Sequence, residues 1–206
     1  QSSNTVRSKA GAALGVLMGH QMRVDQVLLE LVQGIKASID GELPPPSVPG
    51  VDPVDVGDAM ALALAQVLAH VPADKVGEAS RAAIDDVLTA AFLAEEEVSE
   101  PLKKALAELS AAWLAFDTPR AGALLERHVL QPAPVDVQLA ALCLRACVDQ
   151  ASDALYGYCR PPALVPELAT TWMSDAPSVA RPARETRDLL KKVEPWRSDD
   201  EVQNAL

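Results

Sequence analysis

Apolar residues recur along most of this chain at spacings of three, four and seven, which is the period of one face of an α-helix. Near the start of the chain this pattern connects Leu17, Val24, Leu28 and Ile35. No segment shows the sustained alternation of apolar and polar residues that is typical of a half-buried β-strand. The pattern therefore predicts an all-α protein whose N-terminal helix is long.

Capping residues and prolines divide the rest of the pattern into separate helices. A capping side chain close to a following proline is typical of a helix start, because the side chain binds the first turn and proline needs no hydrogen bond there. We expect helices over residues 53–71, from 74 towards 95, and over 99–116, 118–130 and 135–156, the second of them capped by Asp74. The short connections favour an antiparallel multi-helix bundle over residues 1–157.

Residues 158–206 contain six prolines, so only short helices fit between them, at about residues 166–173, 183–193 and 199–205. Ser198 and Glu201 predict a capping box for the last of these helices. Helices this short are marginal in isolation. We therefore expect a C-terminal arm, residues 158–206, that packs on the bundle or on a partner, with Trp172 as its anchor. Packing on the chain's own bundle is the favoured alternative.

Three glycines near the N-terminus, Gly11, Gly15 and Gly19, lie four residues apart. In a helix they share one face, where the absence of side chains lets another backbone approach closely. The series is therefore a candidate for tight helix pairing, including pairing between chains. The alternative is that the helix begins only near His20 and that the glycines belong to a looser segment.

Composition and charge narrow the possible functions. The chain is 49% hydrophobic but only 3% aromatic, which predicts a core of Leu, Val and Ala. Its net charge of −11 works against nucleic-acid binding, which needs several Lys or Arg side chains to displace counterions. The longest apolar run is well short of the ~20 residues that a membrane span needs. We expect neither a nucleic-acid partner nor a membrane span.

The cysteines and histidines do not form a recognisable metal site. Cys143 and Cys147 lie four residues apart among apolar neighbours, and together with Cys159 and His128 they match no standard zinc spacing. We predict that Cys143 and Cys147 are buried thiols without metal. An odd number of cysteines favours reduced thiols and a cytoplasmic location. Because the sequence also lacks a nucleophile elbow, a phosphate loop and a dinucleotide fingerprint, we predict no cofactor and no catalytic residue.

The C-terminal arm provides most of the candidate binding residues. Residues 181–197 carry six basic and three acidic side chains in an otherwise acidic chain. The candidate interaction residues are Gly11, Gly15, Gly19, Trp172, Arg184, Arg187, Lys191 and Trp196.

The sequence favours a helical protein–protein interaction or scaffolding protein without catalytic activity, which binds a protein partner or associates with its own copies. The alternative is a ligand-binding regulatory helical domain with a small apolar pocket. A third and weaker possibility is an enzyme whose site is assembled from dispersed residues.

Overall fold

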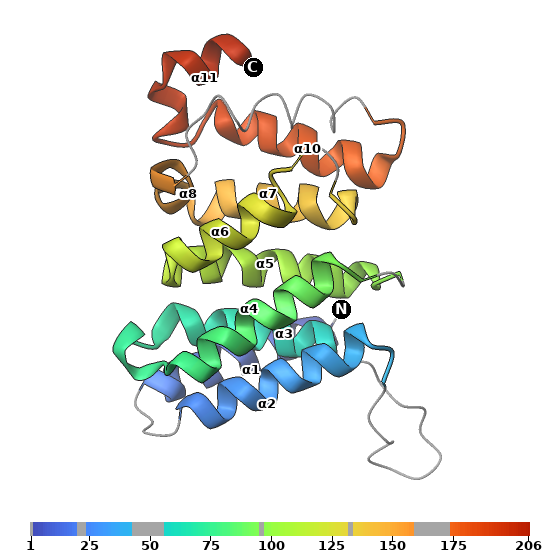
Figure 1. Cartoon of the computed structure of the whole chain (residues 1–206), viewed down its shortest axis with the longest axis vertical. Helices are drawn as coiled ribbons and strands as arrows, with labels where there is room; N and C mark the ends of the chain where they lie inside the picture. Colours follow the sequence, from blue (N-terminus) through green and yellow to red (C-terminus); the bar gives the residue numbers. More distant parts are fainter. Residues whose placement is uncertain (1, 20–23, 43–55, 95–96, 132–133, 159–173) are drawn as a thin grey trace. The chain divides into compact units, whose positions relative to one another are not determined.

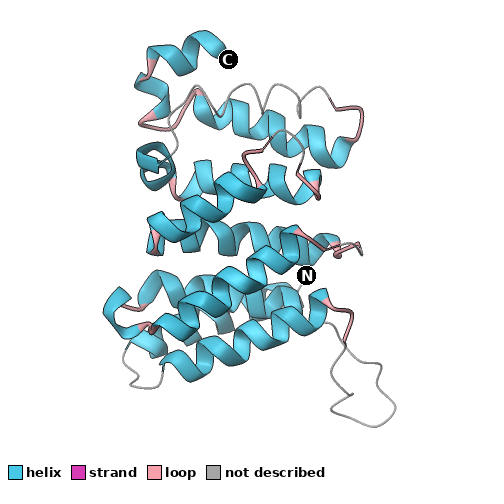
Figure 2. Cartoon of the chain, in the orientation of Figure 1, coloured by secondary structure: helices cyan, strands magenta, loops and turns pink. Residues whose placement is uncertain are grey.

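The computed structural model describes residues 2–19, 24–42, 56–94, 97–131, 134–158 and 174–206. All regular secondary structure in these residues is helical, which confirms the all-α class (Figure 2). The chain forms two compact units, Gln1–Leu109 and Ser110–Leu206, whose boundary falls inside helix α5 (Glu100–Phe116). The boundary that the sequence predicted between residues 157 and 158 lies within the second unit.

The first unit is organised around helix α3 (Gly57–His70). Helices α1 (Ser2–Gly19) and α2 (Val24–Ile39) both pack on α3, and α2 also packs on α4 (Glu78–Phe92) (Figure 1). The largest fully buried side chains of these helices are Leu28, Ile35, Leu64, Ile84 and Leu88. The core of this unit is therefore mainly aliphatic, as the low aromatic content predicts.

Two helices, α1 and α2, occupy the region in which the sequence predicted one long helix. Residues 20–23, between them, lie outside the described residues. A single helix through that region stays a prediction, as does the antiparallel order of the bundle.

Helix α4 is capped by a residue from another helix. The prediction that Asp74 caps it is wrong, because Asp74 lies in a 3-10 helix (Ala73–Lys75) and α4 begins only at Glu78. Asp25 of α2 instead accepts hydrogen bonds from the Gly77 backbone N–H (2.9 Å) and the Ser80 hydroxyl (2.6 Å). Asp25 precedes Gly77 by 52 residues, so a local capping rule cannot find this contact.

The second unit is organised around helix α7 (Val137–Gln150). Helix α10 (Pro177–Leu190) packs along α7, and α8 (Ser152–Tyr158) packs on both α7 and α6 (Thr118–His128) (Figure 1). The buried side chains at its centre include Trp113, Leu139, Cys143, Cys147 and Val148. The helices predicted at residues 99–116 and 118–130 are confirmed by α5 and α6.

The single helix predicted over residues 135–156 is wrong, because the structure has two helices there. Helix α7 begins after Asp136, whose carboxylate accepts a hydrogen bond from the Leu139 N–H at 2.9 Å. The helical backbone stops at Ala151, where φ is −130° and ψ is 37°, and α8 starts at the next residue. Apolar periodicity does not reveal this break, because Val148 before it and Leu155 after it are both buried.

The last two helices also begin at residues other than those predicted. Helix α10 starts at Pro177 and continues through Pro182, whereas the sequence treated Pro182 as a break. The final helix, α11 (Asp200–Ala205), follows a 3-10 helix (Trp196–Ser198). Its cap is Asp199, whose carboxylate accepts from two backbone N–H groups of the first turn, so the predicted Ser198 capping box is wrong.

Candidate interaction surface

The glycine series predicted for helix pairing lies in α1, which spans Ser2–Gly19. At Gly15, an added Cβ would lie 2.6 Å from the carbonyl oxygen of Gln66 and 3.0 Å from Nδ1 of His70, both on α3. The absence of a side chain at Gly15 therefore lets α1 and α3 of the same chain pack closely. What surrounds Gly11 and Gly19 lies outside the described contacts.

Trp196 is the anchor of the C-terminal segment among the described residues. Its side chain is fully buried, and its indole N–H donates a hydrogen bond to the Ser152 hydroxyl at 2.7 Å. Its ring meets Tyr156 edge to face, with centroids 4.9 Å apart, and the Tyr156 hydroxyl donates to Asp199 at 2.8 Å. That hydrogen bond is the main reason why the pKa of Asp199 lies below its ordinary value.

These contacts hold Trp196 inside its own chain, so its side chain is not exposed to a partner. They are also consistent with the expectation that the arm packs on its own chain, at least for residues 174–206. Trp172, the anchor proposed from the sequence, lies outside the described residues.

The basic residues of the arm differ in whether their side chains are bound to another residue of the chain. Arg187 is half-buried and donates a hydrogen bond to the carbonyl oxygen of Leu206. Arg184, Lys191 and Lys192 are exposed, and no described residue forms a hydrogen bond or ion pair with their side chains. Together with Arg181 they form what we call the α10 cationic surface.

The opposite side of α10 is buried and holds the helix against the rest of the second unit. Its buried residues are Val179, Ala180, Pro182, Ala183, Thr186 and Leu190. The Thr186 hydroxyl donates to the carbonyl oxygen of Pro182 at 2.8 Å, within this buried side. Helix α10 therefore presents a charged side outward and an apolar side inward.

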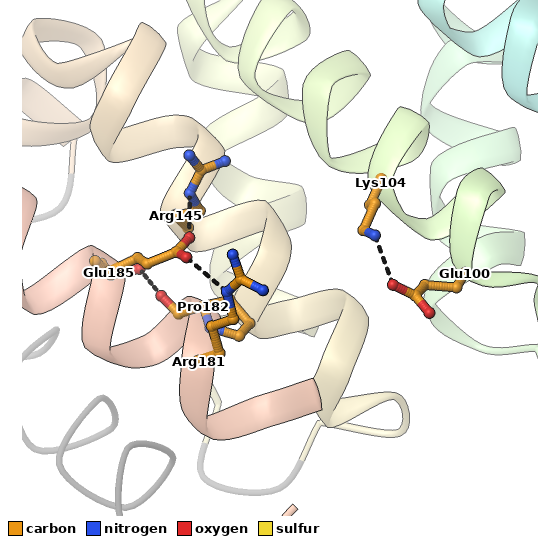
Figure 3. Close-up of polar contacts among 7 residues, drawn as sticks. Glu100, Lys104, Arg145, Arg181, Pro182 and Glu185 are labelled. Atoms are coloured by element: carbon orange, nitrogen blue, oxygen red, sulfur yellow. Dashed lines mark hydrogen bonds and ion pairs between the residues drawn. The ribbon is translucent and has the colours of Figure 1, made fainter. Parts of the chain in front are cut away.

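Sequence reasoning missed a further cation, Arg145 of α7. The carboxylate of Glu185 lies between two guanidinium groups, at 3.0 Å from Nε of Arg145 and at 3.0 Å from Nε of Arg181 (Figure 3). The spacing of Arg181 and Glu185 in a helix predicts their pairing. No sequence signal identifies Arg145, because its place beside Glu185 depends on the packing of α7 against α10.

Large exposed apolar side chains do not gather on one element. Among the described residues they belong to α1, to α3, to the position after α4 and to the start of α7 with the residue two positions before it, and they are Val16, Leu17, Leu62, Leu93, Val135 and Val137. Scattered residues of this kind are normal on protein surfaces. The surface of α10 is therefore set apart by its charge.

The predicted burial of Cys143 and Cys147 is confirmed. Burial raises the pKa of the Cys143 thiol to about 12, and its Sγ lies 3.5 Å from the Ser110 hydroxyl. A thiol with such a pKa is almost entirely protonated at neutral pH, and the thiolate is the form that attacks electrophiles and binds metals. Cys143 therefore serves as a core residue.

His128 is the buried histidine of the described residues, with 8% of its surface exposed. Burial lowers its pKa, and the neighbouring charge of Arg127 lowers it further. Among the described residues, no group of three or more His, Cys, Asp or Glu side chains could hold a metal ion.

No helix in the described part of the chain is both long enough and apolar enough to cross a membrane. Comparisons with protein families, with curated proteins and with solved structures find no match to this chain.

Proposed function

We propose that this chain is a helical protein–protein interaction or scaffolding protein without catalytic activity, and that its partner contacts the α10 cationic surface. The supporting observation is that Arg184, Lys191 and Lys192 are exposed and unpaired among the described residues, in a chain whose net charge is −11. A patch of opposite sign to the whole molecule attracts a partner locally, because charges more than ~8 Å apart are screened at physiological salt.

The spacing of these residues supports one continuous contact. Positions 181, 184, 188 and 191 are separated by three, four and three residues, so they follow one side of the helix. Asp188 is the acidic member of this series. A partner helix or extended segment lying along α10 would meet three cations and one anion.

The packing of α10 against α7 also favours binding. Because α10 buries its apolar side against α7, its outer side chains project from a fixed backbone. A preorganised surface loses less conformational freedom when a partner binds, which leaves more of the interaction energy for affinity.

The test is affinity capture from cells that produce the protein, comparing the wild type with the charge-reversed variant R184E/K191E/K192E. We expect the wild type to retain a partner in stoichiometric amount at low salt and the variant to lose it. The matched control is K9E/K36E/K75E, which changes the net charge equally but lies in the first unit. Equal capture by wild type and R184E/K191E/K192E would contradict the proposal.

Sedimentation of the purified chain separates a second copy of the protein from a different partner. If the partner is a second copy, the wild type sediments as an oligomer at low salt and the reversed variant as a monomer.

A further inference from the structure

The carboxylate of Glu185 is shared by two arginines from different helices. Arg181 of α10 donates from Nε to one carboxylate oxygen of Glu185, and Arg145 of α7 forms an ion pair with the other oxygen, each at 3.0 Å (Figure 3). Two positive groups thus face one negative group, and the cluster keeps one unit of positive charge.

The exposed pair Lys104–Glu100 on α5 provides the contrast, with one cation and one anion 2.5 Å apart (Figure 3).

Both arginines have hydrogen-bonding capacity left over. A guanidinium group carries five N–H donors. Arg181 donates a hydrogen bond to Glu185 from Nε, whereas the Nε of Arg145 lies 3.0 Å from the other carboxylate oxygen as an ion pair without a hydrogen bond. No other hydrogen bond or ion pair with a described residue reaches either side chain. Within the part of the chain that the structure describes, no acceptor occupies the Nη groups of Arg145 and Arg181.

The packing of α7 against α10 holds the charged groups of this cluster close together before any partner binds. Arg145 is held on α7 and its side chain is only 35% exposed, while Glu185 connects it to Arg181 across the packed helices. Arg184 lies one turn along α10 from Arg181 and adds another exposed cation. Guanidinium groups bind carboxylates in a planar, two-point geometry, which suits an acidic side chain better than a neutral one.

We propose that Arg145, Arg181 and Arg184 form a binding site for the carboxylates of an Asp/Glu-rich segment of a protein partner. This inference rests on the proposed function and specifies the partner's chemistry at one end of the α10 cationic surface. A carboxylate of the segment occupies the free Nη groups of Arg145 and Arg181, and Glu185 keeps the two guanidinium groups in place. An acidic peptide is favoured over nucleic acid because a chain of charge −11 repels a dense polyphosphate more strongly.

The test is fluorescence anisotropy of the full chain with a labelled octaglutamate peptide at low salt. Because each exposed ion pair contributes modestly to affinity, we expect R181Q to weaken binding about threefold and R145Q/R181Q about tenfold. Arg181 is 83% exposed, so R181Q leaves the fold intact, and thermal unfolding checks the double variant. K104Q removes one positive charge from a balanced pair and should leave affinity unchanged.

Glu185→Gln gives a prediction of the opposite sign. Glutamine keeps a side-chain oxygen that can accept from the arginines, but it removes the negative charge that opposes an acidic peptide. The peptide should therefore bind as tightly as to the wild type or more tightly. Weaker binding to E185Q, wild-type affinity in R145Q/R181Q, or an equal loss in K104Q and R181Q overturns the inference. Tighter binding of a short DNA duplex than of octaglutamate overturns the choice of an acidic peptide.

Failure of this inference can be distinguished from failure of the proposed function. A partner that R184E/K191E/K192E loses but R145Q/R181Q retains would reject the arginine site alone. The absence of any partner that depends on the α10 cationic surface would reject the proposed function itself.

Discussion

Replacing Trp196 by alanine should destabilise the second unit strongly, because its side chain is fully buried. Truncating a buried tryptophan to alanine typically costs ~3–5 kcal/mol through lost burial and the cavity left behind. The variant also loses the indole hydrogen bond to Ser152 at 2.7 Å, and a net hydrogen bond contributes about 1 kcal/mol. We expect W196A to lower the free energy of unfolding by about 4 kcal/mol.

Urea unfolding of the full chain, followed by far-ultraviolet circular dichroism, measures this loss without relying on tryptophan fluorescence. The control is W196F, which keeps an aromatic ring against Tyr156 but cannot donate to Ser152, so its loss should be about 1–2 kcal/mol. A loss of about 0.5 kcal/mol or less for W196A would refute the conclusion that Trp196 anchors the C-terminal segment to its own chain, since that is the range of ordinary surface substitutions. Equal losses in W196A and W196F would refute the packing argument.

Three further predictions concern single residues. Asp25→Ala should lower the free energy of unfolding by about 1–2 kcal/mol, because it removes the acceptor for Gly77 and Ser80 at the start of α4; a loss within the error of urea titration would contradict this role. Gly15→Ala should destabilise the protein, because the added Cβ would lie 2.6 Å from a backbone oxygen of α3. The control is Gly157→Ala in helix α8, where the added Cβ meets nothing within 4 Å, so this variant should be neutral or stabilising by up to ~1 kcal/mol. Similar thermal midpoints for both variants would argue against the close approach. Burial lowers the pKa of His128 below its ordinary 6.5, so the unfolded chain takes up a proton before the folded one does, and stability should be steady above pH 6.5 and fall as the pH drops below it. H128Q should reduce the difference between the free energies of unfolding measured at pH 7.5 and at pH 5.5. A difference as large as that of the wild type would show that another group is responsible.

The fold could be predicted from the sequence where local rules and tertiary contacts agree. Helices α5 and α6 begin close to the prolines that indicated them, at Glu100 and Thr118, and their apolar faces are buried. The cap position of α6 is Asp117, whereas the Thr118 hydroxyl donates to the carbonyl oxygen of Leu114. Burial of Cys143 followed from its apolar neighbours, because a free thiol behaves as a small hydrophobic side chain. In these places the information needed lies within a few residues.

Prediction failed where a distant residue or a packed surface decided the outcome. Pro182 removes a backbone N–H and costs a helix interior about 3 kcal/mol, yet α10 continues through it because its apolar side is buried against α7. Asp25 takes the role assigned to Asp74 because folding brings α2 beside α4.

The residues of the candidate site also differ in whether the sequence reveals them. The exposed cations Arg184 and Lys191 are visible as a basic stretch in the sequence. Arg145 is not, because it lies 40 residues from Glu185 and meets it only after α7 and α10 have packed.

The boundary between the two units inside α5 has a consequence for how the protein unfolds. A cut after Leu109 would leave two helical fragments of ten and seven residues, Glu100–Leu109 and Ser110–Phe116, both shorter than the ~12–15 residues that an isolated helix needs. When one unit melts, it withdraws support from its part of α5 and shortens the helix that the other unit requires. The two units should therefore lose their structure in a linked fashion, with α5 as a shared cooperative element, and should be difficult to prepare as separate stable fragments.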